Sequence, residues 1–223
     1  MRNFLRWLIR SLVHLLTDME VRGYENLPPT KNYLLATNHI GIIDGIMPFV
    51  ALNRWDIYIP VAEKWEQNRF LNWLGRYFNF IFIDRFNPDI KAMRRIIHLM
   101  EAGNVVAMSP EGTRSRTGAL IEGKPGVTYL ASKLDCPIVP IAVTGTEDKV
   151  LLGNIKRFKK THITVTAGPY FSIPPILREN RDEMLKMHTD DLMCRIAALL
   201  PERYRGFYKD HPRLKEYLDP TKN

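Results

Sequence analysis

The sequence predicts a single α/β domain with a largely parallel or mixed central sheet flanked by helices. A chain of 223 residues has the length of one domain with a sizeable core. Its 45% hydrophobic and 25% charged residues are ordinary for a globular protein. Short apolar runs alternate with helical patterns, and this alternation is typical of parallel strands joined by crossover helices.

The expected strands are apolar runs that contain many β-branched and aromatic residues, at 33–37, 57–61, 80–83, 105–108, 138–143 and 163–167. The segments between them carry helical periodicity, which predicts helices over 44–52, 69–78, 89–101, 126–134 and 181–200. Pro140 interrupts the fifth strand, so we expect an edge or a bulge there.

The N-terminal segment has an unusual pattern. Arg6, Arg10 and His14 recur every four residues, and nearly all the other residues from 4 to 16 are apolar. This narrow basic stripe on a broad apolar helix favours a helix lying in the membrane interface; a helix packed on the protein's own core is the alternative. We expect a membrane-interface helix over 1–20 and the main domain over 21–223. No apolar run is long enough to predict a membrane span.

The composition limits the classes of binding partner. The net charge of +8 indicates anionic partners: nucleic acid, a phosphorylated substrate or an acidic membrane surface. The sequence lacks the aromatic RNA-binding motifs and zinc spacings that would favour nucleic acid, so no nucleic-acid partner is expected. Only two cysteines are present, Cys136 and Cys194, which fits a reducing compartment without a disulfide framework.

The most informative residues are His39 and Asp44, which lie five positions apart across Gly41, after the first expected strand. In a continuous helix their side chains would point about 140° apart. A turn at Gly41 followed by a helix would bring them together. An imidazole oriented by a carboxylate is the usual core of a general base. The alternative is a helix-capping aspartate beside an incidental loop histidine.

Further polar residues follow the other expected strands. The loop Glu111-Gly112-Thr113-Arg114-Ser115 combines a flexible turn with hydroxyls and a guanidinium that can bind a phosphate; a solvated surface loop is the alternative. Glu111 would repel a phosphate, so it either positions Arg114 or bonds a substrate hydroxyl. Arg85 and Lys64 also follow expected strands. Arg85 either belongs to a basic pocket or forms a structural ion pair. Lys64 either belongs to the same basic pocket or lies on the solvated surface.

Four motifs occur in one order: His39-x4-Asp44, residues 80–85, residues 110–115, and Val139-Pro140-Ile141-Ala142. Together they resemble the glycerophospholipid acyltransferase family, and the 1-acyl-sn-glycerol-3-phosphate acyltransferases in particular. The resemblance covers about residues 20 to 170. It implies acyl transfer from a thioester, acyl-CoA or acyl-carrier protein, to the free hydroxyl of a lysophospholipid, with phosphatidate as the product. Another acceptor, such as glycerol 3-phosphate, and a thioester or ester hydrolase remain alternatives.

The resemblance also assigns roles. His39 is the general base and Asp44 orients it. Glu111, Gly112, Thr113 and Arg114 match the motif that binds the glycerol phosphate. Arg85 matches a motif linked with the acceptor, and Lys64 takes a phosphate-facing role if the register shifts by one residue. Because the thioester is already activated, we expect no cofactor and no metal. We expect the enzyme on the cytoplasmic face of the cell membrane, as a peripheral or monotopic protein among membrane lipids.

Overall fold

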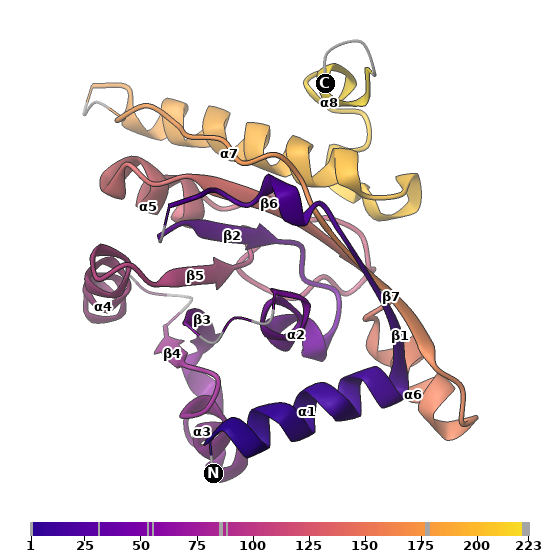
Figure 1. The fold of residues 1–223 in the computed structure, drawn as a ribbon. Coiled ribbons are helices and arrows are strands. Elements are labelled where there is room, and N and C mark those ends of the chain that lie inside the picture. Colours follow the sequence, from indigo (N-terminus) through magenta and orange to yellow (C-terminus); the bar gives the residue numbers. More distant parts are fainter. Residues whose placement is uncertain are drawn as a thin grey trace.

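The computed structural model describes residues 2–30, 32–52, 54, 56–84, 87, 89–176 and 179–219. Its centre is a seven-stranded sheet (Figure 1). In spatial order the strands are β1 (Thr17–Arg22), β7 (Thr161–Ala167), β6 (Ile138–Thr144), β2 (Leu34–Thr37), β5 (Val105–Met108), β3 (Ile57–Ala62) and β4 (Phe80–Ile83). All neighbours run parallel except β6 and β7. The predicted α/β class with a mixed sheet is therefore confirmed.

Helices cover both faces of this sheet. One face is covered by α4 (Ile90–Glu101), α5 (Gly126–Leu134) and α7 (Arg181–Leu199), with α8 (Leu214–Leu218) beyond them; the other is covered by α1 (Arg2–Leu16), α2 (Met47–Leu52) and α3 (Arg69–Gly75). The remaining helix, α6 (Asp148–Lys156), covers neither face and lies at the edge formed by β7 and β1.

Strand β2 shows why the apolar runs form this sheet. Leu34 and Ala36 belong to the core under α4, α5 and α7, whereas Leu35 belongs to the core under α1 and α2. All three side chains are fully buried. A strand covered on both faces needs apolar residues at every position, which is why it reads as a continuous apolar run.

Three of the described α-helices and strands have no counterpart among the predicted ones: β1, α6 and α8. Residues 17–22 carry Asp18, Glu20 and Arg22 on an edge strand, so the apolar run that marks the other strands is missing. As a result the N-terminal helix ends at Leu16, and the residues after it join the sheet instead of extending a helix to residue 20. The division at residue 20 into two domains stays a prediction.

Pro140 does not lie on an edge strand, but the expected bulge is present: Ile141 pairs with Ala167 and Ile138 with Phe171, so the partner segment has one extra residue opposite Pro140. β6 is a central strand between β7 and β2, and Pro140 lies inside it, buried. Its pairing explains the tolerance: the antiparallel ladder with β7 begins one residue later, at Ile141 opposite Ala167. Pro140 therefore lies at the end of that ladder, where its carbonyl accepts the Gly168 N–H at 2.9 Å.

Helix α1 packs on the protein's own core on one side and exposes apolar side chains on another, and its membrane contact stays a prediction. Val13 is buried against the sheet, and the Arg6 guanidinium donates to the Tyr77 carbonyl at 3.2 Å. A second set of apolar side chains points to the outside: Phe4, Trp7, Leu8, Leu12 and Leu15. Among the described residues, no helix is both long enough and apolar enough to cross a membrane.

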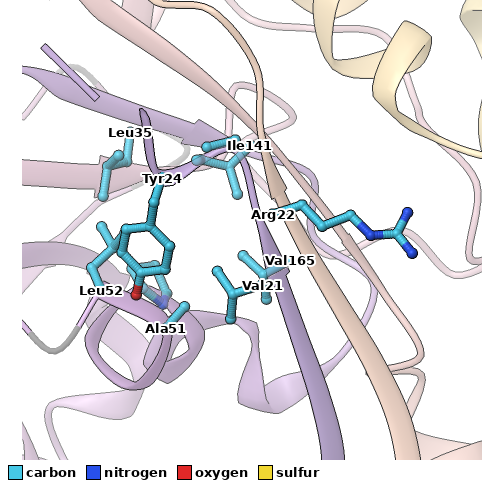
Figure 2. Close-up of a pocket in the computed structure, with 10 residues that line it drawn as sticks. Val21, Arg22, Tyr24, Leu35, Ala51, Leu52, Ile141 and Val165 are labelled. Carbon is cyan, nitrogen blue, oxygen red and sulfur yellow. The ribbon is translucent and has the colours of Figure 1, made fainter. Parts of the chain in front are cut away.

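A small apolar cavity lies on the same face of the sheet as α1. Figure 2 shows Leu35, Ile141 and Val165 from the sheet facing Ala51 and Leu52 from α2, while the Arg22 side chain points away. Its volume of about 20 Å³ is enough for about one water molecule. The cavity in this conformation is therefore too small for a ligand of several heavy atoms.

Candidate active site

Three loops meet at one edge of the sheet. β6, β2 and β5 are neighbours and run parallel, so the loops that follow them leave from the same edge. These loops carry His39 after β2, residues 109–115 after β5, and residues 145–148 after β6. The carboxyl ends of parallel strands are where α/β proteins usually bind ligands.

Asn38 holds the loop after β2 to the neighbouring strand. Its side chain is buried; the amide NH₂ donates to the Val143 carbonyl at 2.8 Å and the amide oxygen accepts the Val143 N–H at 2.7 Å. These two bonds continue the sheet pairing beyond the end of β2. They place the next residue, His39, at the rim of the sheet.

His39 and Asp44 form the contact that the sequence predicts. The His39 Nδ1 and the Asp44 Oδ2 are 2.9 Å apart. The same oxygen accepts the backbone N–H groups of Ile40 at 2.6 Å and Gly41 at 2.8 Å. The Asp44 side chain is 2% exposed and that of His39 31%. The carboxylate is thus buried and anchored by the backbone, while the imidazole reaches the surface.

Two structural details allow this arrangement. Residues Ile42–Ile46 form a 3₁₀ helix before α2, so the chain turns more tightly than the predicted helix from residue 44. A side chain at Gly41 would place its Cβ 1.8 Å from the Thr146 carbonyl oxygen. Only glycine fits, because the turn packs directly against the loop after β6.

Glu111 lies directly behind His39. Its Oε1 accepts the His39 backbone N–H at 2.9 Å, and its Oε2 accepts the Ile121 N–H at 3.0 Å. The residue has no exposed surface. Burial raises the pKa of this carboxyl to about 7, against the lowering effect of the two backbone N–H donors. We expected Glu111 to bind the acceptor or position Arg114; in the structure it supports the His39 backbone.

The rest of that loop completes the support. The Ser115 N–H donates to the His39 carbonyl at 2.8 Å, so the 111–115 loop holds His39 through both of its backbone polar groups. Gly112 has φ +66°, and a Cβ there would lie 3.1 Å from the Lys124 side chain. Thr113 and Arg114, at the tip of the loop, are exposed.

Arg114 pairs with Asp148, a residue that the sequence analysis did not single out. Asp148 is the first residue of α6 and follows β6. Its other oxygen, Oδ1, accepts the Ile42 N–H at 2.9 Å, so one carboxylate joins the arginine loop to the His39 turn. The sequence contains a signal for Asp148, because it follows an apolar run, as His39 and Glu111 do.

The remaining predicted residues lie elsewhere. Lys64 is exposed after β3, with its ammonium 5.2 Å from the centre of the Trp65 ring. β3 is separated from β2 by β5, so Lys64 follows a strand that is not adjacent to the one before His39. Arg85 lies outside the described residues. Within the described ranges, no group of three His, Cys, Asp or Glu side chains could hold a metal ion.

Comparison with known proteins places the chain in a family. Residues 18–144, more than half of the chain, match the model of the Acyltransferase family. A 1-acyl-sn-glycerol-3-phosphate acyltransferase of Bacillus subtilis (strain 168) is 28% identical over 194 residues, covering 86% of this chain and 92% of that protein. An enzyme of the same name from Limnanthes douglasii is 35% identical over 189 residues, covering 81% and 64%.

Other relatives are longer than this chain. The 1-acyl-sn-glycerol-3-phosphate acyltransferase alpha of Mus musculus is 32% identical over 139 residues, and the match spans about half of that protein, 46%. A similar fold occurs in the crystal structure of the 1-acyl-sn-glycerophosphate (LPA) acyltransferase PlsC from Thermotoga maritima. It has a TM-score of 0.61 and 24% identity, and the match covers 86% of this chain and 80% of that one.

Proposed function

Because the chain belongs to the acyltransferase family, we propose that it moves a fatty acyl group from a thioester to the free hydroxyl of 1-acyl-sn-glycerol 3-phosphate, giving phosphatidate. The acceptor is the one named for its relatives. The observation that carries the mechanism is the 2.9 Å contact between His39 Nδ1 and the buried Asp44 carboxylate.

In the proposed reaction, His39 acts as the general base. Asp44 accepts the Nδ1–H of the imidazole and thereby leaves Nε2 as the basic nitrogen. Nε2 removes the proton from the lipid hydroxyl, and the hydroxyl oxygen attacks the thioester carbonyl carbon. The carbon–sulfur bond then breaks, and the imidazolium returns the proton to the leaving thiolate. Base assistance of this kind is worth about 10²–10⁴-fold in rate.

Arg114 is the proposed ligand of the acceptor phosphate. The Arg114 side chain is 45% exposed and therefore accessible to a ligand, and it lies on the loop that holds the His39 backbone. Arginine binds phosphate bidentately. A phosphate at this point would compete with Asp148 for the guanidinium. The chemistry needs no cofactor, and the acyl donor is acyl-CoA or acyl-carrier protein.

We also propose that the protein works on a membrane surface, as a peripheral or monotopic protein on its cytoplasmic face. The outward apolar residues of α1, Trp7 and Leu12 among them, are arranged as in a helix that lies in the interface. A membrane contact would bring the enzyme to acceptors that carry a long acyl chain.

A panel of acceptors assayed with acyl-CoA, following free thiol and lipid product, tests the proposal. We expect turnover with 1-acyl-sn-glycerol 3-phosphate and its loss in His39→Ala, with vesicle binding unchanged. Full activity of His39→Ala would exclude the dyad. Turnover of another acceptor alone would reassign the substrate. Release of free fatty acid without any acceptor would indicate a hydrolase instead.

A further inference from the structure

The loop that follows α6 carries an unusual side chain at its tip. Phe158 is 99% exposed and has φ +53°. The two hydrogen bonds around it, Phe158 N–H to the Ile155 carbonyl at 3.1 Å and Lys159 N–H to the Asn154 carbonyl at 2.9 Å, form the helix-ending motif in which glycine is the usual left-handed residue. A bulky aromatic residue is unfavourable here for two reasons: its backbone takes a left-handed conformation, and its apolar ring is exposed to water.

Four cations surround that aromatic ring in the sequence: Lys156, Arg157, Lys159 and Lys160. All four are exposed. In the part of the chain that the structure describes, none of them forms an ion pair with a carboxylate; the Lys160 ammonium donates to the carbonyl of His14 at 3.2 Å. The nearby carboxylates of Asp18 and Glu20 lie against His162 instead, at 3.4 and 4.0 Å. The loop therefore carries four positive charges that no carboxylate of the described residues neutralises, two on each side of an exposed phenylalanine.

The contact between Lys160 and His14 also fixes where the loop lies. It joins the loop to the C-terminal turn of α1, the helix whose apolar residues Trp7, Leu12 and Leu15 face outward. Figure 1 shows α6 beside that end of α1. An exposed aromatic residue within a cluster of cations, next to an outward apolar helix, matches the chemistry of an anionic lipid surface.

Strand direction places this loop on the active-site side of the sheet. β7 runs antiparallel to β6, so its first residues lie at the edge where β6 and β2 end. Thr144, the last residue of β6, pairs with Thr164, and β7 begins at Thr161. The loop before β7 thus projects about 10 Å past that pair. α6 connects it directly to Asp148, which bonds the His39 turn.

We propose that residues 156–160 form a second membrane contact, in which Phe158 enters the interface of an anionic bilayer and the four cations bind its headgroups. The proposal rests on the membrane-surface function proposed for α1 and extends it. With α1 as the other contact, the loop would orient the active-site edge of the sheet toward the lipid that supplies the acceptor.

Vesicle binding by the full chain tests this loop. The probes are vesicles of phosphatidylcholine with and without phosphatidylglycerol, and the main variant is Phe158→Gly. We expect at least tenfold weaker binding to the anionic vesicles, since a buried phenylalanine side chain contributes at least that much. Glycine suits the left-handed backbone, so the same variant should melt at the same or a higher temperature. If Phe158 had only a structural role, Phe158→Gly would lower the melting temperature and leave vesicle binding unchanged.

Charge variants and controls complete the test. Lys156→Glu with Lys159→Glu should weaken binding by about fivefold or more per cation, and added salt should reduce the difference from the wild type. Phe207→Ala and Lys133→Glu, exposed residues on the opposite face of the sheet, should bind as the wild type does. Wild-type binding by the loop variants would overturn the proposal. So would variants that keep vesicle binding but lose binding to acyl-carrier protein, since the patch would then serve an acidic protein.

Activity in solution separates this proposal from the proposed function. With a short-chain lysophosphatidate and a short-chain acyl-CoA that are both monomeric in water, Phe158→Gly should retain wild-type turnover. If the wild type turns over neither substrate but the loop variants still lose vesicle binding, the proposed reaction fails and the membrane contact stands.

Discussion

Glu111 offers the sharpest test of how the site is built. Glu111→Gln keeps the shape of the side chain but replaces one acceptor oxygen with an NH₂ group. Both carboxylate oxygens accept backbone N–H groups, from His39 and Ile121. Whichever way the amide turns, one buried N–H loses its acceptor, and this loss costs about 1–3 kcal/mol.

The pH dependence of this cost has a definite sign. The folded pKa of Glu111 is about 7, above the ordinary value of 4.5, because burial disfavours the charged carboxylate. The folded state therefore binds the proton more tightly than the unfolded state. The stability from this group is fully present below pH 4.5 and is lost as the pH rises to about 7, by about 3 kcal/mol in all. Glutamine does not titrate and lacks this loss.

We therefore expect the stability deficit of Glu111→Gln to be largest below pH 4.5 and to shrink as the pH rises toward 7. Urea unfolding of both proteins across this range measures it. Glu122→Gln is the control, an exposed glutamate in the following loop. A deficit that grows with pH would show that the ionised carboxylate stabilises the fold, and would refute the reasoning.

Activity distinguishes support of His39 from acceptor binding. If Glu111 positions the His39 backbone, Glu111→Gln should lower kcat by about 10–10²-fold, as displaced catalytic groups do, and leave the acceptor KM within about twofold. A role in binding glycerol phosphate predicts the reverse, a raised KM with kcat retained.

Other substitutions test the neighbouring contacts. Gly41→Ala should destabilise the protein by about 1–3 kcal/mol and lower kcat, because its Cβ would collide with the Thr146 carbonyl oxygen, whereas Gly45→Ala meets no atom within 4 Å and should be neutral; urea unfolding compares the two. Arg114→Ala should raise the KM for a phosphorylated acceptor with a loss of about 1.5–3 kcal/mol, and an unchanged KM would remove the phosphate from this position. Asp148→Asn should lower that KM, since it releases the Arg114 guanidinium; a raised KM in steady-state assays would contradict the competition between carboxylate and phosphate.

Much of the fold was predictable because its signals are local. The strands at 80–83 and 105–108 and the helix at 126–134 have the predicted bounds, since each is an apolar or periodic run that its own residues define. β1, α6 and α8 were not, because an edge strand and short helices on the surface need little apolar sequence. The pairing of β1 also depends on β7, more than a hundred residues later in the chain.

The α/β class and the family resemblance follow from the sequence alone. The pairing of His39 with Asp44 spans five residues with a glycine between them, so a turn that joins them could be proposed, and the family resemblance favoured it over a capping aspartate beside an incidental histidine. The contacts behind the pair come from the tertiary structure. Glu111 reaches His39 across 72 positions, and Arg114 reaches Asp148 across 34. The role of a carboxylate depends on which donors surround it and on its burial, and both are properties of the packed loops rather than of the residues beside it in the chain.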